Sequence, residues 1–257
     1  PFLLLDYAGP AVFGPARQQR GVGEHPHRGF ETVTVVYQGE VEHRDSTGAG
    51  GRIGPGDVQW MTAGRGIVHS ERTPAEDRAQ GQTMHGIQTW VALPKDQEKV
   101  APSFAHHAAD TLPKFDCPGV QGVVIAGDAF GLTAPVQVSS RTLYVALELA
   151  AGASLVIPPE HEDRGVYLVD GAVTIDGEAL DPQHLAVLEP GGDVTLTAQV
   201  SSRVMLLGGA PTDGRRHIYW NFVASDQADI EDAKQRWQDD RFAHVPGETE
   251  RIPLPAR

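Results

Sequence analysis

The chain has 257 residues, 40% of them hydrophobic, which allows one large globular domain or two of average size. With 34 acidic and 21 basic side chains its formal net charge is −13, which argues against the basic surface that phosphate backbones require. The single cysteine, Cys117, excludes an internal disulfide and a CxxC zinc or redox site.

The chain starts at Pro1, inside the strand-like run FLLLDY, so further residues, including a removed targeting segment, can precede it. No basic, apolar and small-residue signal opens it, and no apolar run reaches the roughly 18 residues needed to span a bilayer. One cysteine fits a reducing compartment. We therefore expect a cytoplasmic protein with no membrane or direct nucleic-acid partner, and we expect a monomer.

Short β-like runs separated by turns fill most of the chain, which has 29 glycines and 19 prolines. Such spacing predicts an all-β sandwich or barrel. The clearest runs are ETVTVVYQG, VEHRDS, GDVQWMT, GIQTWVALP, GVVIAG, APVQVSS, TLYVALELA, ASLVIPP, GVYLVDGAVTIDG, HLAVLEP, DVTLTAQV and SRVMLLGG.

Residues 225–242 are the exception to this β pattern. Ser225 can cap a helix, acidic residues crowd the first turn, and Ile230, Ala233 and Trp237 fall at i, i+3 and i+7. The segment therefore predicts one amphipathic C-terminal helix in which Trp237 is a packing residue.

The two halves of the chain contain a weak internal repeat. The run EHPHRGFETVTVVYQGEVEH at 24–43 resembles EHEDRGVYLVDGAVTIDGE at 160–178. In this alignment His27 corresponds to Asp163, and nothing in the second copy corresponds to His69. The repeat predicts two similar barrels, of which only the first keeps its histidines.

The repeat and the composition together suggest domain boundaries. We expect an N-terminal metal-binding barrel over residues 1–93 and a polar, Pro-rich connection over 94–118. A degenerate C-terminal barrel is expected over 119–210, and a tail that carries the helix over 211–257.

The argument for a metal depends on two pairs, His25-x-His27 and His69-x-Glu71. Residues two apart on a strand project to one face, so each pair can point to one place inside a barrel. Pro26 cannot donate a ladder hydrogen bond, which puts the first pair at a strand start or a sheet edge. Three imidazoles and a carboxylate suit a divalent transition metal.

A second carboxylate competes for the fourth ligand position. Glu31 lies four residues after His27, where the cupin superfamily commonly supplies its carboxylate ligand. Strand alternation places Glu31 on the same face as His25 and His27. Spacing alone therefore leaves Glu31 and Glu71 as alternatives.

The segments HPHRGFETVTVVYQGEVEHRDS, PGDVQWMTAGRGIVHSE and GIQTWVALP closely resemble the pirin family of bicupins. The resemblance is strong over residues 1–93 and fair over the second half. It implies an all-β fold of two cupin (jelly-roll) β-barrels in tandem with one C-terminal α-helix. The family's ligands are the two histidines of HPHRG and the His and Glu that follow TAGxG. The ligands implied here are His25, His27, His69 and Glu71, which leaves Glu31 outside the set.

The surroundings of the metal are placed from proximity along the sequence. The candidate pocket residues are Arg28, Phe30, Met61, Met84, His85 and Gln88. The arginine and glutamine are expected to orient the ligands, the three apolar side chains to wall a pocket, and the histidine to approach it. We expect His43 on a strand outside the ligand set.

Bacterial pirin-like proteins are associated with quercetin 2,3-dioxygenase activity. The resemblance therefore implies a metal-dependent dioxygenase that opens flavonol-like rings with O2 and releases carbon monoxide. Fe(II) is the expected ion, with Mn, Ni, Co, Cu or Zn as alternatives. Four protein ligands leave two positions of an octahedral ion for substrate and O2. Glu71 can alternate between ligand and base for the flavonol hydroxyl.

The resemblance also implies a rival function, because some relatives are described as co-regulators that bind a protein partner. The same ligands would then hold a metal that reports redox state without turnover. A cupin-type isomerase acting on another small molecule is a third reading. No GxSxG elbow, P-loop or GxGxxG element supports hydrolase or nucleotide chemistry.

Overall fold

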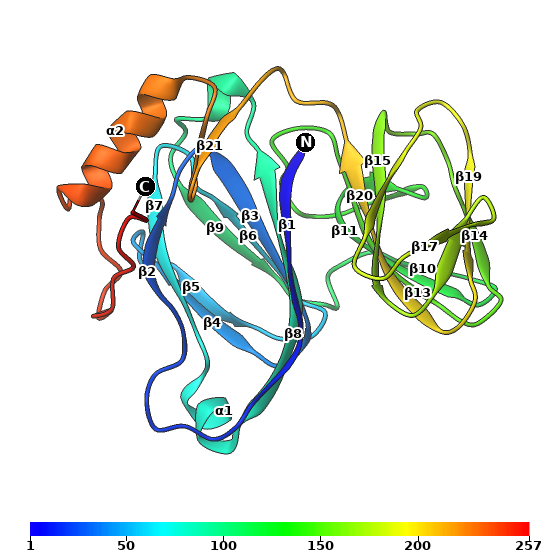
Figure 1. The fold of residues 1–257 in the computed structure, drawn as a ribbon, viewed down its shortest axis with the longest axis horizontal. Coiled ribbons are helices and arrows are strands. Elements are labelled where there is room, and N and C mark those ends of the chain that lie inside the picture. Colours follow the sequence, from blue (N-terminus) through cyan, green and yellow to red (C-terminus); the bar gives the residue numbers. More distant parts are fainter. Residues whose placement is uncertain (257) are drawn as a thin grey trace. The chain divides into compact units, whose positions relative to one another are not determined.

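The computed structural model describes residues 1–256 and divides into two compact units (Figure 1). The first, called here the histidine unit, comprises Phe2–Ala109 and the chain from Thr212 onwards. The second, the insert unit, comprises Asp110–Pro211 together with Pro1. The described residues lie mainly in antiparallel strands, which confirms the predicted all-β class.

The histidine unit contains two main sheets and a small two-stranded one. The five-stranded sheet has the order β1 (Phe2–Phe13), β8 (Gln82–Ala92), β3 (Phe30–Gln38), β6 (Val58–Thr62), β9 (Ser103–His107). The four-stranded sheet has the order β2 (Gly21–His27), β7 (Ile67–Arg72), β4 (Val41–Asp45), β5 (Gly50–Ile53). The two-stranded sheet joins β21 (His217–Tyr219) to β22 (Phe222–Ala224).

The insert unit repeats the plan of two antiparallel sheets. Its larger sheet has the order β10 (Lys114–Cys117), β11 (Val120–Ala129), β13 (Thr142–Leu149), β20 (Ser202–Gly209), β15 (Asp163–Asp170), β18 (Leu185–Leu188), and β12 (Leu132–Thr133) also pairs with β11. Its smaller sheet has the order β14 (Ser154–Ile157), β19 (Val194–Ala198), β16 (Val173–Ile175), β17 (Glu178–Leu180).

The segment expected as a connection, 94–118, contains two of these strands. β9 pairs with β6 in the histidine unit, and β10 pairs with β11 in the insert unit. Both are sheet edges, where polar and exposed side chains are tolerated. Because their sequences are polar, a prediction based on apolar runs does not find these two strands.

Two α-helices, α1 (Ala75–Gln80) and α2 (Gln227–Gln238), and a 3-10 helix at Lys95–Gln97 complete the histidine unit. The sequence does not predict α1, because its six residues bury no side chain and carry no apolar periodicity. Among the described residues no helix is both long and apolar enough to cross a membrane.

The C-terminal helix α2 differs from its predicted bounds of 225–242. Its N-cap is Asp226, whose side chain accepts a hydrogen bond of 2.9 Å from the backbone N–H of Ala228. Ser225 instead donates through both its N–H and its hydroxyl to Glu98. The expected apolar stripe is present, since Ile230, Ala233 and Trp237 are buried.

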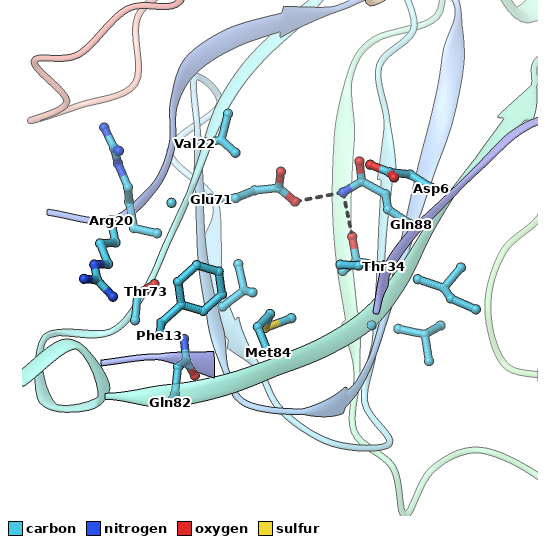
Figure 2. A pocket seen from close by; sticks show the side chains of 17 residues that line it. Asp6, Phe13, Arg20, Val22, Thr34, Glu71, Thr73, Gln82, Met84 and Gln88 are labelled. Atoms are coloured by element: carbon cyan, nitrogen blue, oxygen red, sulfur yellow. Dashed lines mark hydrogen bonds between the residues drawn. The ribbon is translucent and has the colours of Figure 1, made fainter. Parts of the chain in front are cut away.

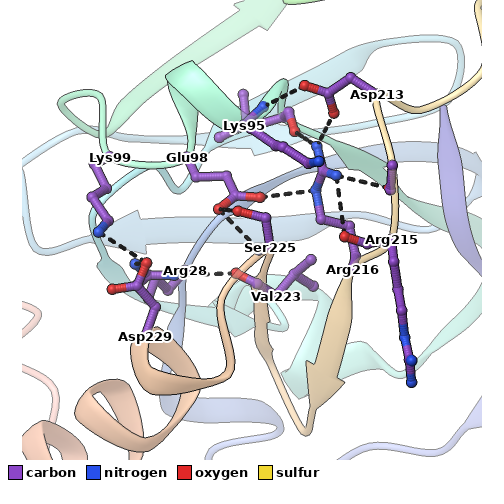
Figure 3. A network of polar contacts seen from close by, with 12 residues as sticks. Arg28, Lys95, Glu98, Lys99, Asp213, Arg215, Arg216, Val223, Ser225 and Asp229 are labelled. Atoms are coloured by element: carbon purple, nitrogen blue, oxygen red, sulfur yellow. Dashed lines mark hydrogen bonds and ion pairs between the residues drawn. The ribbon is translucent and has the colours of Figure 1, made fainter.

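Ion pairs fasten the C-terminal segment to the histidine unit (Figure 3). Arg216 Nε lies 2.8 Å from Glu98 Oε1, with both side chains almost fully buried. Arg28 Nη2 lies 2.9 Å from Asp229 Oδ2 on α2, which also binds Lys99 Nζ at 2.9 Å. The strand that carries the first histidine pair is thus linked, through Arg28, to the last helix of the chain.

A tight turn at Gly29 separates β2 from β3. Gly29 has φ 82°, and a Cβ placed there would lie 1.9 Å from the carbonyl oxygen of Val223. Only glycine fits this approach, since other residues rarely adopt positive φ and the backbone cannot give way. The turn ends the strand after His27, so Glu31 belongs to β3. The expectation that Glu31 alternates on one strand with the two histidines is therefore wrong.

Candidate metal centre

Three histidines from two strands converge in the histidine unit. In the antiparallel pairing of β2 with β7, His25 lies opposite His69, and His27 follows two residues later on β2. One ligand nitrogen from each imidazole lies within 4.8 Å of the others, and all three side chains are buried. Within residues 1–256 this is the one set of three or more potential ligands close enough together to hold a metal ion.

Burial favours the neutral form of these imidazoles. Desolvation lowers the pKa values of His27 and His69 well below the ordinary 6.5, and neighbouring histidines lower them further. Burial also lowers the pKa of His25, although the nearby carboxylate of Glu71 acts in the opposite direction. Neutral imidazoles present a lone pair at neutral pH, so the donor set fits a divalent transition metal.

The backbone fixes which nitrogen of His25 carries its proton. Nδ1 lies 2.8 Å from the carbonyl oxygen of Gly23, which can only accept a hydrogen bond. Nδ1 is therefore the donor, and Nε2 keeps its lone pair. The ring is thus held in the tautomer that a metal would require.

Glu71 lies beside this cluster and is held by an amide. It follows His69 by two residues on β7, and its Oε1 accepts a hydrogen bond of 2.8 Å from Gln88 Nε2 (Figure 2). The same amide nitrogen donates to Thr34 Oγ1 at 3.1 Å. Glu71 lines one cavity with His25 and His27, although it is not a member of the close histidine set.

The competing carboxylate lies elsewhere. Glu31 is buried on β3, and its Oε1 accepts a hydrogen bond of 2.8 Å from Thr62 Oγ1 on β6. It lines neither cavity beside the histidines. Of the two carboxylates only Glu71 shares a cavity with the imidazoles, so the assignment of Glu71 as fourth ligand is carried forward as a proposal.

Two cavities meet at Glu71 and Gln88. The first, of about 380 Å³, contains His25 and His27 in its wall. The second, of about 430 Å³, combines apolar side chains such as Phe13 and Met84 with polar ones such as Thr34 and Gln82 (Figure 2). The residues common to both walls are Asp6, Val22, Glu71 and Gln88. Since these walls draw on strands of both main sheets, the cavities lie between the sheets.

The pocket residues expected from sequence proximity divide into two groups. Met84 and Gln88 line the larger cavity, and Gln88 lines both. The remaining four, which line neither cavity, are Arg28, Phe30, Met61 and His85.

The contacts of these four explain their positions. Arg28 pairs with Asp229. The ring of Phe30 packs against Trp90, with 4.4 Å between the ring centroids, and also meets the ring of His27 in an edge-to-face contact. The side chain of Met61 is buried in a separate apolar cluster.

His85 lies next to Met84 on β8 but takes part in a different contact. Its Nε2 lies 3.1 Å from the hydroxyl of Tyr7, and its ring packs against Tyr37. Successive residues of a strand face opposite sides, so His85 points away when its neighbour lines the cavity.

Two polar residues behind the cluster, His43 and Asp45, make contacts that sequence reasoning did not predict. His43 lies on β4 outside the ligand set, as expected, but its Nδ1 is 3.1 Å from His69 Nδ1. Its other nitrogen, Nε2, is 3.2 Å from Oδ2 of the fully buried Asp45. The spacing His43-x-Asp45 on a strand was the available signal, since it places both side chains on one face.

The corresponding part of the insert unit is built differently. The guanidinium of Arg164 is buried and donates to the carbonyl oxygens of Ile157, Pro158 and Glu189. The counterpart of His27 in the repeat, Asp163, is exposed. Arg164 corresponds to Arg28 in the repeat, so this part of the described chain keeps the arginine but has no histidine cluster.

Comparison with known proteins gives two family matches, and the second extends from the insert unit into the C-terminal part of the histidine unit. The family model described as Pirin matches residues 1–91, and the model described as Pirin C-terminal cupin domain matches residues 144–243. The chain is 44% identical over 244 residues to a pirin-like protein of Caulobacter vibrioides, covering 94% of this chain and 84% of that protein.

Two solved structures extend the comparison. Quercetin 2,3-dioxygenase from Acinetobacter baumannii aligns with a TM-score of 0.91 at 35% identity, covering 95% of this chain and 87% of that one. The bacterial pirin YhhW from Escherichia coli in complex with nickel(II) aligns with a TM-score of 0.61 at 26% identity, covering 78% and 80%. The prediction of tandem cupin barrels with a C-terminal helix is confirmed.

Proposed function

Because this chain belongs to the pirin family, we propose that it is a metal-dependent dioxygenase of the quercetin 2,3-dioxygenase type. The single observation that carries the proposal is the convergence of the buried imidazoles of His25, His27 and His69 beside a cavity that the first two line and that shares part of its wall with a second, larger cavity. The similarity to quercetin 2,3-dioxygenase from Acinetobacter baumannii supports the reaction class.

The proposed metal ligands are His25, His27, His69 and Glu71. Imidazole and carboxylate donors fit Fe(II), our first choice, and also Mn, Ni, Co, Cu or Zn. The nickel(II) complex of YhhW supports a metal in this family without fixing the ion for this chain. When bound, such an ion supplies Lewis acidity and a path for one-electron transfer.

The protein's own residues would bind and orient the substrate. A flavonol is a flat, largely apolar molecule with a hydroxyl beside a carbonyl, and the larger cavity offers the apolar walls of Phe13, Met84 and Ile87. We place the hydroxyl near Glu71, at the boundary of the two cavities. Glu71 accepts the hydroxyl proton, and Gln88 holds the carboxylate by donating to Oε1. Ring opening then consumes one O2 and releases carbon monoxide.

Anaerobic loading with Fe, Mn, Co, Ni or Cu, followed by addition of quercetin and O2, tests the proposal. We expect carbon monoxide release with at least one ion, and we expect His27→Ala to lose both the bound ion and turnover. A matched His85→Ala variant removes a histidine outside both cavities and should keep them. Protein that binds one equivalent of each ion yet shows no turnover would overturn the proposal and favour the regulatory function.

A further inference from the structure

A chain of hydrogen bonds leads from a buried carboxylate to one histidine of the metal centre. Asp45 Oδ2 lies 3.2 Å from His43 Nε2, and His43 Nδ1 lies 3.1 Å from His69 Nδ1. All three side chains are buried, with exposed fractions of 0%, 3% and 1%. The outer nitrogen of His69, Nδ1, therefore contacts the imidazole of His43, whereas the corresponding nitrogen of His25 contacts the carbonyl oxygen of Gly23.

The carboxylate of Asp45 is a fixed acceptor. Its Oδ1 accepts hydrogen bonds from Thr47 N–H at 2.7 Å, Thr47 Oγ1 at 2.6 Å and Ala49 N–H at 3.2 Å. Burial acts to raise the pKa of Asp45, but the hydrogen bonds from His43 and Thr47 outweigh it and the net pKa is lowered. Oδ2 is therefore an anionic acceptor turned towards His43.

These contacts determine which nitrogen carries the hydrogen, first in the His43 ring and then in the His69 ring. Because Asp45 Oδ2 accepts, His43 Nε2 carries the hydrogen, and an imidazole with a single ring hydrogen then has its lone pair on Nδ1. That lone pair accepts from Nδ1–H of His69, so Nε2 of His69 is left with its lone pair. Nε2 is also the atom that faces His27 Nε2, at 2.8 Å. The His43 ring is held in place by stacking on Phe104, 4.1 Å away and nearly parallel.

We propose that Asp45 and His43 form a relay that locks His69 in the tautomer able to bind metal through Nε2. Both are positioning residues that act through His69. Outer partners of this kind orient a ligand histidine and raise its basicity. The inference depends on the proposed metal site but on no assumption about the reaction, and it can be tested without turnover.

Asp45→Asn is the informative substitution. The asparagine carbonyl can keep the three bonds that Asp45 Oδ1 accepts, while its NH2 replaces Oδ2 and donates to His43 Nε2. His43 must then carry its proton on Nδ1 and donate to His69 Nδ1. The hydrogen of His69 moves to Nε2, where it blocks the metal. The substitution thus reverses the direction of both hydrogen bonds in the relay and keeps the hydrogen bonds that residue 45 accepts from Thr47 and Ala49.

Two measurements follow this reversal. Long-range ¹H–¹⁵N NMR on metal-free protein should show His69 as the Nδ1–H tautomer in the wild type and as the Nε2–H tautomer in Asp45→Asn. Competition with a chromophoric chelator should show Ni(II) binding weakened by about 10- to 100-fold. The matched control, Thr47→Val, loses one bond to Oδ1 but leaves Oδ2 unchanged, and we expect its affinity to stay within about threefold of wild type.

Variants at His43 test the same step if Asp45→Asn fails to fold. His43→Gln supplies an amide oxygen to accept from His69 while its NH2 donates to Asp45, and should retain tautomer and affinity. His43→Phe keeps the stack on Phe104 but removes the acceptor, and should weaken Ni(II) binding. An unchanged His69 tautomer in Asp45→Asn, or equal Ni(II) affinity for the Gln and Phe variants, would overturn the relay. Neither result depends on quercetin turnover, so the two proposals fail separately.

Discussion

His25 lies directly opposite His69 in the antiparallel pairing of β2 with β7. The backbone ladder between two segments distant in sequence therefore sets the spacing of two potential ligands. β2 is the edge strand of its sheet, which agrees with the position expected from Pro26. A register slip of one residue would turn His69 to the opposite face and separate the imidazoles.

Replacing Glu71 by glutamine distinguishes the two candidate carboxylates. Glu71→Gln keeps the shape of the side chain but removes the anionic donor and the base, so we expect about 10- to 100-fold weaker Ni(II) binding and loss of quercetin turnover. Glu31→Gln, outside both cavities, is the matched control and should retain both. If Glu31→Gln lost metal and Glu71→Gln kept it, the ligand assignment would be reversed.

Filling the larger cavity should weaken substrate binding and leave the metal content unchanged. Met84 lines that cavity but is not a ligand, so Met84→Trp is expected to raise KM for quercetin at least about tenfold with metal content unchanged. Met84→Leu nearly conserves volume and serves as the control. Steady-state kinetics and elemental analysis check both. An unchanged KM in the tryptophan variant would show that quercetin binds elsewhere.

The buried pair of Glu98 with Arg216 should be important for stability. Glu98→Ala removes one of the two carboxylates that pair with the buried guanidinium of Arg216, leaving Asp213, and also removes two bonds from Ser225, which we expect to cost about 3 kcal/mol. The exposed neighbour Lys99 provides a control, since Lys99→Ala should cost less than about 1 kcal/mol.

Tryptophan fluorescence during urea unfolding can measure this loss for the histidine unit alone. The chain's four tryptophans, Trp60, Trp90, Trp220 and Trp237, all belong to that unit. Equal midpoints for Glu98→Ala and wild type would contradict the assigned role of the pair.

Glu248 gives the histidine unit an acid-sensitive contact. Hydrogen bonds from Arg72 lower the pKa of Glu248 from 4.5 to about 2, and the two side chains are only 2% and 3% exposed. A carboxylate whose pKa is lower in the folded state than in the unfolded chain stabilises the folded state at pH values above the unfolded pKa. This contribution disappears as the pH falls from about 4.5 towards 2.

The shift corresponds to about 3 kcal/mol at neutral pH. Glu248→Gln should therefore be destabilised by that order at pH 7, and the difference from wild type should shrink at pH 3. Urea unfolding at the two pH values, followed by tryptophan fluorescence, measures it. A difference that stayed constant between pH 7 and pH 3 would rule out the charge of Glu248 as the cause.

The sequence predicts much of the fold and of the histidine cluster for a simple physical reason. Alternation along a strand is visible in the order of residues, so His25 and His27 can be assigned to one face before the fold is known. Glu31 could not be placed in this way, because the turn at Gly29 interrupts the alternation. That turn depends on the close approach of Val223, nearly two hundred residues later.

The contacts of the polar residues behind the site also could not be predicted from local sequence patterns. The contact of His43 with His69 joins β4 to β7, and the pairing of those strands is a property of the assembled sheet. Glu98 and Ser225 likewise meet only because the chain returns after the insert unit. Local patterns predicted the ligand strands, whereas the partners that orient and enclose them come from distant parts of the chain.

The discontinuity of the histidine unit sets an order of synthesis. A ribosome completes the insert unit, Asp110–Pro211, before it has made the residues from Thr212 onwards that finish the histidine unit. The ligand strands are thus made early, but the backbone that packs on Gly29 is made late. The metal centre can therefore reach its final form only after the residues from Thr212 onwards have been made and have packed on the earlier strands.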